Sequence, residues 1–254
     1  MKSKSKTKTI KLMPRNEHWY LSPKHKGVYY PGVTYVCGFL PKGQAFERYL
    51  ANQESYEESR RLLEEAGLKG THVHRMSEEL ERGAKIAYEN SGLTDEEFQL
   101  LSFFVDWHGK YSPKVKHIEL VLISDKLKLG GTCDRVYEID GKTVLLDLKT
   151  SKSAIYDSHH IQCAAYAQMY EELHKKQIDQ VAILRLTPRR KEGFEYVTRD
   201  RKEWQKDFKQ FKKTYDTMMY LNDDKAIVPK IIEVPEILLL DTTPKITSKV
   251  TGTK

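Results

Sequence analysis

The sequence predicts an α/β fold in which β-strands are framed by α-helices on both sides. Over residues 117–221, aliphatic and β-branched runs of strand length alternate with amphipathic stretches of helical spacing. An acidic, helix-rich stretch precedes them, with 13 acidic against 7 basic residues over 45–100. A chain of 254 residues that is 39% hydrophobic is long enough to bury one sizeable core.

The first half of the chain is expected to be mainly helical. GVYYPGVTY (28–36) is rich in Tyr and Val, which predicts a strand that turns at Pro31-Gly32. Apolar residues then recur at helical spacing, and Thr94 is a suitable N-cap for the last of these helices. The helices are predicted over 43–66, from about 70 past 80, and over 95–107.

The second half of the chain is expected to carry the sheet. Asp140 and Gly141 predict a two-residue hairpin turn, because both residue types tolerate the positive φ angles that this turn needs. In chain order we expect strands over 117–123, 129–139 and 143–149, a helix over 158–174, strands over 180–186 and 194–198, and an amphipathic helix over 200–221.

The positive charge of the chain is concentrated at its two ends. The sequence has 43 basic and 36 acidic residues, a formal charge of +7. Residues 1–13 hold five lysines and residues 242–254 hold three, with no acid in either segment, so 35 basic and 36 acidic residues remain between them. This distribution excludes a uniformly cationic surface that coats nucleic acid.

A single domain is expected over residues 14–228, because no repeat or low-complexity linker interrupts it. Its helical part spans about 43–108 and its sheet-and-helix core about 116–221. A basic flexible tail (1–13) precedes it, and a C-terminal extension with a basic tail (229–254) follows it.

Cysteine usage indicates a reducing compartment. Cys37, Cys133 and Cys163 are odd in number and widely spaced, unlike the ligands of a cysteine-built metal or iron–sulfur site. No run reaches the roughly 18–20 apolar residues of a membrane helix, and the N-terminus lacks the apolar core of a secretory signal. We expect a cytoplasmic protein that is not secreted, with mitochondrial targeting as the alternative reading of the Lys- and Ser-rich N-terminus.

Two aspartates and a lysine stand out in the predicted hairpin. Asp134 lies on one arm, and Asp147 and Lys149 lie on the other, where their spacing puts them on the face opposite to Leu146 and Leu148. Two carboxylates and the Leu148 carbonyl are the hard oxygen ligands that Mg²⁺ takes. The alternative is a solvent-facing ion pair, which contributes about 0–1 kcal/mol.

Three segments that surround these residues carry a resemblance. GGTCDRV, LLDLKTSK and HIQCAAYA, in that order and spacing, resemble the RecB-like branch of the PD-(D/E)XK nuclease superfamily. PGVTYV and GTHVH are similar to N-terminal segments of its phage and mitochondrial single-strand DNA exonucleases, so the resemblance covers about residues 28–172. It implies a restriction-endonuclease-like core with a central mixed sheet, and a nuclease that uses one or two Mg²⁺ or Mn²⁺ ions. The cysteines of the iron–sulfur relatives are absent, so no such cluster is expected.

The resemblance implies a metal site and a catalytic lysine. Asp134 and Asp147 match the two metal-binding aspartates, with Asp147 where Glu is commoner, and the Leu148 carbonyl joins them. His74 matches a histidine that completes a metal site, whereas His72 would lie about 200° away on a helix. Lys149, Gln162 and Tyr166 match the residues around the attacking water and the scissile phosphate, and Glu119 matches a glutamate that several members keep.

The expected substrate is DNA, degraded from single-stranded or frayed ends in phage or in recombination and repair, which for a viral protein means the host cytoplasm. Thr150 and Ser151 are candidate phosphate donors or simple strand-end residues. Residues 185–213 hold 11 basic against 5 acidic residues, and Arg189, Arg190 and Lys191 are expected to contact DNA from a loop, with a solvated surface as the alternative. An endonuclease of the same superfamily, restriction-like or junction-resolving, and a catalytically silent DNA-binding module remain open.

Overall fold

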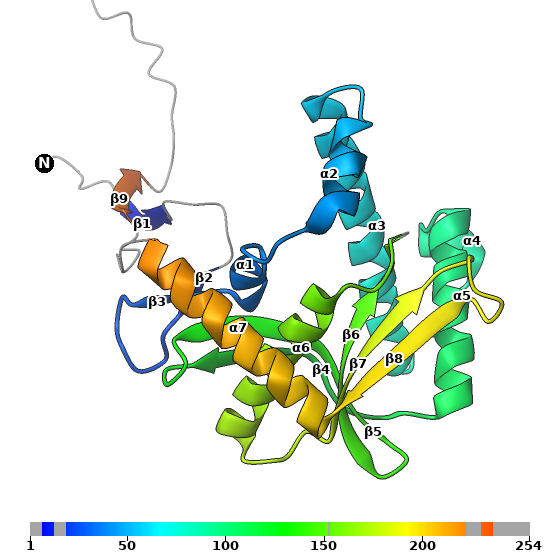
Figure 1. Ribbon diagram of the computed structural model, residues 1–254. Coiled ribbons are helices and arrows are strands. Elements are labelled where there is room, and N and C mark those ends of the chain that lie inside the picture. The colour runs from blue at the N-terminus through cyan, green and yellow to red at the C-terminus, as the bar shows by residue number, and fades with distance from the viewer. Residues whose placement is uncertain (1–6, 13–18, 152, 222–229, 236–254) are drawn as a thin grey trace, which may run out of the picture. The chain divides into compact units, whose positions relative to one another are not determined.

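A five-stranded mixed sheet is the centre of the larger of two units in the computed structural model (Figure 1). The structure describes residues 7–12, 19–151, 153–221 and 230–235. Parallel pairing joins β6 to β7, and all other neighbours in the sheet are antiparallel. The strand order is β4 (Lys114–Ser124), β5 (Leu129–Ile139), β6 (Lys142–Lys149), β7 (Gln180–Leu186) and β8 (Phe194–Asp200).

Helices cover both faces of this sheet, which confirms the predicted α/β class. One core cluster joins Leu145 to side chains of α1 (Val33–Cys37), α6 (Asp157–His174) and α7 (Arg201–Leu221). The other joins Leu146 and Leu148 to side chains of α3 (Tyr56–Glu81) and α5 (Asp95–Tyr111). Because β6 is buried on both faces, its sequence is a nearly continuous apolar run in which Asp147 is the exception.

Two short-range predictions are confirmed in detail. Asp140 and Gly141 connect β5 to β6 with φ angles of 49° and 73°, as the two-residue turn requires. Thr94 caps α5: its hydroxyl accepts a hydrogen bond from the Glu97 amide while the Glu97 carboxylate accepts one from the Thr94 amide.

Two predictions for the helical half are wrong. The chain breaks after α2 (Gly43–Ala51), and Ser55 caps α3, which then runs without interruption through Gly67 and Gly70. The predicted break at these glycines fails because the cap lies upstream of it. The short α4 (Tyr88–Ser91) precedes α5.

The segment 28–36 is also more helical than predicted. β2 (Trp19–Leu21) pairs with β3 (Tyr29–Pro31), and the chain turns at Gly32 into α1. Val33 and Val36, three residues apart, are fully buried on the inner side of α1. Their helical spacing, rather than the β-propensity of Val and Tyr, decides this segment.

The smaller unit holds Met1–Asn16 and Ile227–Lys254. In it β1 (Thr7–Leu12) pairs antiparallel with β9 (Lys230–Pro235). Both strands fall within the segments that the sequence assigns to a tail (1–13) and an extension (229–254), and the other residues of those segments lie outside the described part. Among described helices, none is long and apolar enough to cross a membrane.

Candidate active site

An open cleft of about 510 Å³ lies between α3, α1, the first turns of α6 and the strands β4 to β6. It brings together residues that are up to 132 positions apart, since Thr34 and Tyr166 both line it. The predicted site residues that line it are His74, Glu119, Asp134, Asp147, Leu148, Lys149, Thr150, Ser151, Gln162 and Tyr166.

Three carboxylates occupy one row across neighbouring strands. Continuing the registers of β4 with β5 and of β5 with β6 places Glu119 opposite Asp134 and Asp134 opposite Asp147. Residues that lie opposite one another share a face of the sheet, so their negative charges face the same cleft. Three neighbouring acids in a partly buried row repel one another unless a cation lies between them.

The β5–β6 ladder stops at this row. Backbone pairing ends at Arg135 and Leu146, and beyond it a side chain replaces the backbone: the Leu148 amide donates to Asp134 Oδ2 over 2.8 Å. Burial first, and then the charge of Asp147, raise the pKa of Asp134. The hydrogen bond from the Leu148 amide therefore fixes the Asp134 carboxylate in position, while burial and Asp147 make its ionised form less favourable.

His74 reaches the row from α3. Its Nε2 lies 3.0 Å from the Leu148 carbonyl oxygen, and its Nδ1 lies 3.7 Å from Asp134 Oδ2. His72, two residues earlier, instead contacts the Glu97 carboxylate with Nδ1 at 2.9 Å. The helical geometry thus separates the two histidines as the sequence predicts, with His74 in the cleft.

Glu119 occupies a strained position on β4. Its φ of 47° is in the left-handed region, which costs a non-glycine residue about 1–3 kcal/mol. Burial first, and then the charges of Asp134 and Glu78, raise its pKa to about 7. The strain aims the carboxylate into the cleft, since ligand atoms of Glu119, Asp134 and His74 all lie within 4.8 Å of one another.

This trio fits a divalent cation. Carboxylate oxygens, an imidazole nitrogen and the adjacent Leu148 carbonyl are hard or borderline ligands of the kind that Mg²⁺ and Mn²⁺ accept. Burial first, and then repulsion between neighbouring carboxylates, raise the pKa values of Asp134 and Glu119, and a bound cation would offset both effects. Asp147 is not in the trio, because its carboxylate faces a different pair of side chains.

Lys149 and Gln162 hold the Asp147 carboxylate. Lys149 Nζ lies 2.7 Å from Oδ2, and the Gln162 amide donates to Oδ1 over 3.2 Å. Burial would lower the pKa of Lys149, but the charges of Asp147 and Asp134 outweigh it and raise that pKa. Lys149 is therefore an ammonium group at neutral pH, fixed on the same strand face as Asp147 as the two-residue spacing predicts.

Tyr166 closes one side of the cleft from α6. Its ring packs on Gly131, where a Cβ atom would lie only 2.4 Å from Tyr166 Cε1. Glycine at this position of β5 thus lets the aromatic ring approach the strand that carries Asp134.

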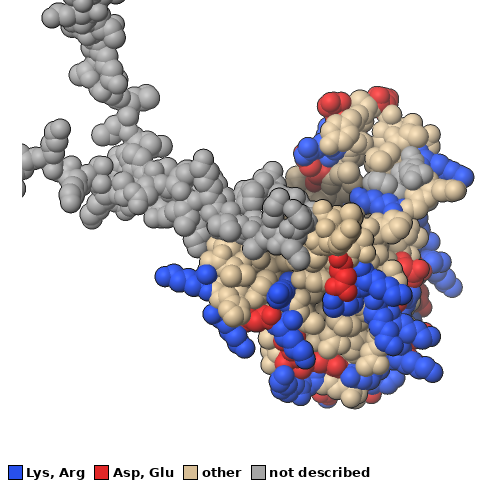
Figure 2. All heavy atoms as spheres, turned by 60° about the vertical axis from the view of Figure 1, so that its left-hand side comes forward, with Lys and Arg blue, Asp and Glu red and all other residues tan. Residues whose placement is uncertain are grey.

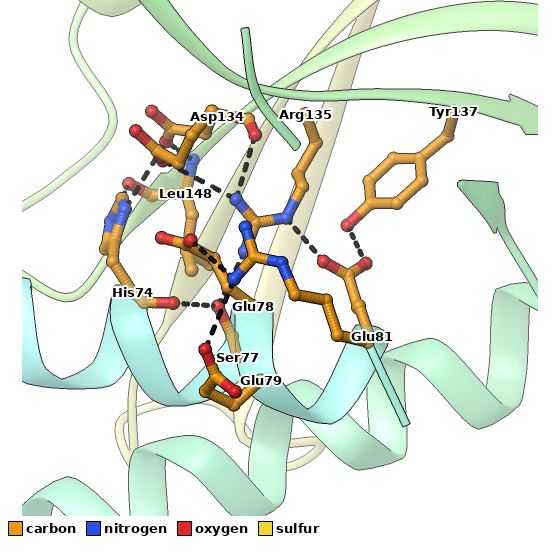
Figure 3. A network of polar contacts seen from close by, with 11 residues as sticks. His74, Ser77, Glu78, Glu79, Glu81, Asp134, Arg135, Tyr137 and Leu148 are labelled. Atoms are coloured by element: carbon orange, nitrogen blue, oxygen red, sulfur yellow. Dashed lines mark hydrogen bonds and ion pairs between the residues drawn. The ribbon is translucent and has the colours of Figure 1, made fainter. Parts of the chain in front are cut away.

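A buried polar network, which is absent from the sequence-based predictions, fixes α3 against β5 (Figure 3). Arg135, which is 1% exposed, forms an ion pair with Glu81 and donates to Ser77 Oγ over 2.9 Å. Tyr137 donates to the other Glu81 oxygen over 2.6 Å. His74, Ser77 and Glu81 lie on one face of α3, since they are three and four residues apart.

The same network reaches the cleft at three points. Ser77 Oγ donates to the His74 carbonyl, and Arg135 Nη1 donates to the Asp134 carbonyl over 2.8 Å. Arg135 Nη1 also lies 3.6 Å from Glu119 Oε1. A charged residue in a strand position between buried neighbours, Cys133 and Tyr137, is the sequence signal that could have revealed it.

The predicted DNA contacts differ in position. Thr150 and Ser151 line the cleft, and Thr150 Oγ1 comes within 3.2 Å of where a Cβ on Gly70 would lie. Arg189, Arg190 and Lys191 are exposed in the β7–β8 turn, outside the cleft lining. Because β7 runs parallel to β6, this turn follows the strand end that neighbours Lys149.

Comparison with known proteins identifies the chain's family. The sequence profile described as the PD-(D/E)XK nuclease superfamily matches residues 40–226. The chain belongs to this superfamily. The matched segment contains His74, Asp134, Asp147 and Lys149, and thus all of the predicted site residues that line the cleft.

Solved structures give weaker similarities, and no curated protein sequence matches the nuclease. A candidate exonuclease from Eubacterium rectale is 12% identical with a TM-score of 0.42, over 65% of this chain and 70% of that one. LHK-Exo in complex with dAMP is 13% identical with a TM-score of 0.33, over 77% and 92%. The protein SSO0001 is 15% identical with a TM-score of 0.29, over 53% and 65%.

Proposed function

We propose that this nuclease is a divalent-metal-dependent DNA exonuclease that hydrolyses phosphodiester bonds from single-stranded or frayed ends. The observation that carries the proposal is the meeting of Asp134, Asp147 and Lys149 with His74 and Glu119 in one open cleft. The residue types and their order also support the similarity to single-strand exonucleases of phage and mitochondria, and thus a role in phage DNA processing or in recombination and repair.

Several residues of the cleft would serve as metal ligands. His74, Asp134, Asp147 and the Leu148 carbonyl would hold Mg²⁺ or Mn²⁺, with Glu119 as a further ligand for one or two ions. When bound, such an ion supplies positive charge that stabilises the phosphate and the leaving oxygen during hydrolysis. The raised pKa values of Asp134 and Glu119 fit this assignment, since a cation favours the ionised forms of both carboxylates.

Lys149 orients the attacking water. Its ammonium group is held by Asp147 at 2.7 Å, so it donates hydrogen bonds to the water and offsets charge that grows on the phosphate. Gln162 fixes the opposite side of Asp147, and Tyr166 borders the space for the scissile phosphate. Thr150 and Ser151 offer hydroxyl donors to the DNA backbone, and Arg189, Arg190 and Lys191 extend the contact beyond the cleft.

Two alanine variants test the proposal directly. Asp147→Ala and Lys149→Ala should each lower Mg²⁺-dependent cleavage of DNA by about 10²–10³-fold, because each removes charge from the site of reaction. DNA binding measured in EDTA should survive both changes. Lys142→Ala, an exposed lysine at the far end of β6, is the matched control and should cut at the wild-type rate. Wild-type digestion by either cleft variant would refute the assignment.

The form of the DNA separates this function from its alternatives. An exonuclease degrades linear DNA and spares covalently closed circles, whereas an endonuclease of the superfamily cuts both. A catalytically silent binding module cuts neither with Mg²⁺ present. End-labelled single- and double-stranded substrates then show which strands and ends are used.

A further inference from the structure

One face of α7 carries a straight line of exposed lysines. Lys202, Lys206, Lys209 and Lys213 are separated by four, three and four residues, which places them within about 60° of one another around the helix. All four are exposed. Figure 2 shows Lys and Arg side chains gathered on the body of the fold, with fewer acidic side chains among them.

The acidic residues of α7 do not neutralise this line. Asp207 pairs with Arg199, and Asp216 pairs with Lys212. Glu203 accepts a hydrogen bond from the Asp200 amide at the start of the helix. Within the described part of the chain, the four lysines have no ion-pair or hydrogen-bond partner, whereas Arg201 and Lys212 are both paired.

An aromatic side chain ends the same line. Tyr220 lies 18 residues after Lys202, which is five whole turns, so it projects from the same face as the lysines. It is 84% exposed, the largest exposure among the large hydrophobic side chains described. Trp204, Phe211, Tyr215 and Met218 of α7 face the core instead.

We propose that Lys202, Lys206, Lys209, Lys213 and Tyr220 form a second binding surface, the α7 track, for single-stranded nucleic acid. The lysines contact phosphates along about 16 Å of the helix, and Tyr220, about 27 Å from Lys202, stacks on a base. Phosphate contacts without base-edge donors make the track tolerant of sequence, and a stacking aromatic needs an unpaired base, which favours single strands over duplex.

The track rests on the proposed function and extends it away from the cleft. α7 packs against α1, and α1 contributes Thr34 to the cleft lining. A strand held on α7 therefore remains attached close to the cleft between cuts. This retention favours repeated cleavage of one molecule over release after each cut.

Salt dependence of DNA binding tests the track. Binding of full-length protein to fluorescent oligo(dT) is measured in EDTA over a salt series. The variant K202Q/K206Q/K209Q/K213Q should show a slope of log K against log salt that is shallower by up to about 2.8, since each single-strand phosphate contact contributes about 0.7. Y220A should weaken binding to oligo(dT) by about tenfold and leave binding to an abasic strand unchanged, while Y220F should behave as wild type.

A charge-matched control removes the effect of net charge. K26Q/K85Q/K142Q/K176Q loses the same four charges from exposed positions in separate loops and at the start of β6, and should keep the wild-type slope. An α7 variant with the same slope as this control would overturn the proposal and leave the face as a solvated surface or a protein contact. Mg²⁺-dependent digestion of linear DNA reports the proposed nuclease function separately: its absence in the wild type refutes that function without changing the binding result, which is measured in EDTA.

Discussion

The close packing of the Tyr166 ring on Gly131 leaves no room for a side chain at position 131. The ring lies where a Cβ on Gly131 would be 2.4 Å from Cε1. Gly131→Ala therefore forces the ring or β5 to move, and we expect a loss of about 1–3 kcal/mol in the free energy of unfolding. Chemical denaturation measures this loss. Gly109→Ala is the matched control, since nothing lies within 4 Å of its Cβ position inside α5, and it should stabilise by about 0.5–1 kcal/mol.

Buried His160 links stability to pH. His160 is only 3% exposed. Burial first, and then the charge of Arg199, lower its pKa to about 4. The unfolded chain therefore binds a proton below about pH 6.5 that the folded protein takes up only near pH 4. Stability should fall by about 2–3 kcal/mol as the pH drops through this window.

His160→Gln removes this linkage, so its free energy of unfolding should change less between pH 6.5 and 4 than that of the wild type. Denaturant titrations at several pH values measure the difference. Substituting the exposed His25 by Gln is the control. An identical pH dependence in His160→Gln and the wild type would show that other groups cause the acid sensitivity.

At the scale of elements, the Arg135 network positions α3 on the sheet. Arg135→Met leaves the Glu81 carboxylate buried without its cation and should destabilise the fold by about 3–5 kcal/mol. The double variant Arg135→Met/Glu81→Met removes both charges and should recover part of this loss. Because the network holds His74 and Asp134 together, both variants should also bind Mn²⁺ more weakly, as calorimetry would measure.

A conservative variant of Arg135 tests whether its side chain positions the metal ligands or only compensates the buried charge of Glu81. Arg135→Lys keeps the charge but cannot reach Glu81, Ser77 and the Asp134 carbonyl at once, since an ammonium lacks the planar fork of a guanidinium. We expect it to restore stability more than Mn²⁺ affinity. Equal recovery of both quantities would show that charge compensation alone matters.

Local sequence patterns predict most of the strands, whereas they do not predict contacts between residues far apart in the chain. β5 and β7 have the bounds that the sequence predicts, because their apolar runs end at clear turn residues. The sequence predicts a helix boundary within α3, since Gly67 and Gly70 weaken the helical pattern; in the structure both glycines line the cleft. The contact of Arg135 with Glu81 joins residues 54 positions apart, and local periodicity carries no information about such a pair.

For the candidate site, residue types and order indicated which side chains meet. His74, Asp134, Asp147 and Lys149 line one cleft as the resemblance implies. Two further features depend on strand registers that the whole sheet sets. They are the left-handed backbone of Glu119 and the contacts of Lys149 and Gln162 with the Asp147 carboxylate. Neither feature has a signature in the local sequence.

At the scale of the whole molecule, the chain is basic in total, but its cleft is lined by several acidic residues. The cleft joins Glu78, Glu119, Asp134 and Asp147, of which only Asp147 lies beside a lysine of the cleft. A cation that binds the folded cleft and not the unfolded chain stabilises the whole fold by RT ln(1 + [L]/Kd). At 100 times the dissociation constant this amounts to about 2.7 kcal/mol.

Metal addition should therefore raise the melting temperature of the protein. For a unit of this size, about 2.7 kcal/mol corresponds to roughly 5–10 °C, which thermal unfolding in EDTA and in excess Mn²⁺ measures. Asp134→Asn should abolish the response and raise the melting temperature in EDTA, because it removes a charge whose burial and whose repulsion with Asp147 together raise the pKa of Asp134. Glu89→Gln, an exposed acid in α4, should keep the full response. If Asp134→Asn responds to Mn²⁺ as the wild type does, the cation binds outside the row of carboxylates.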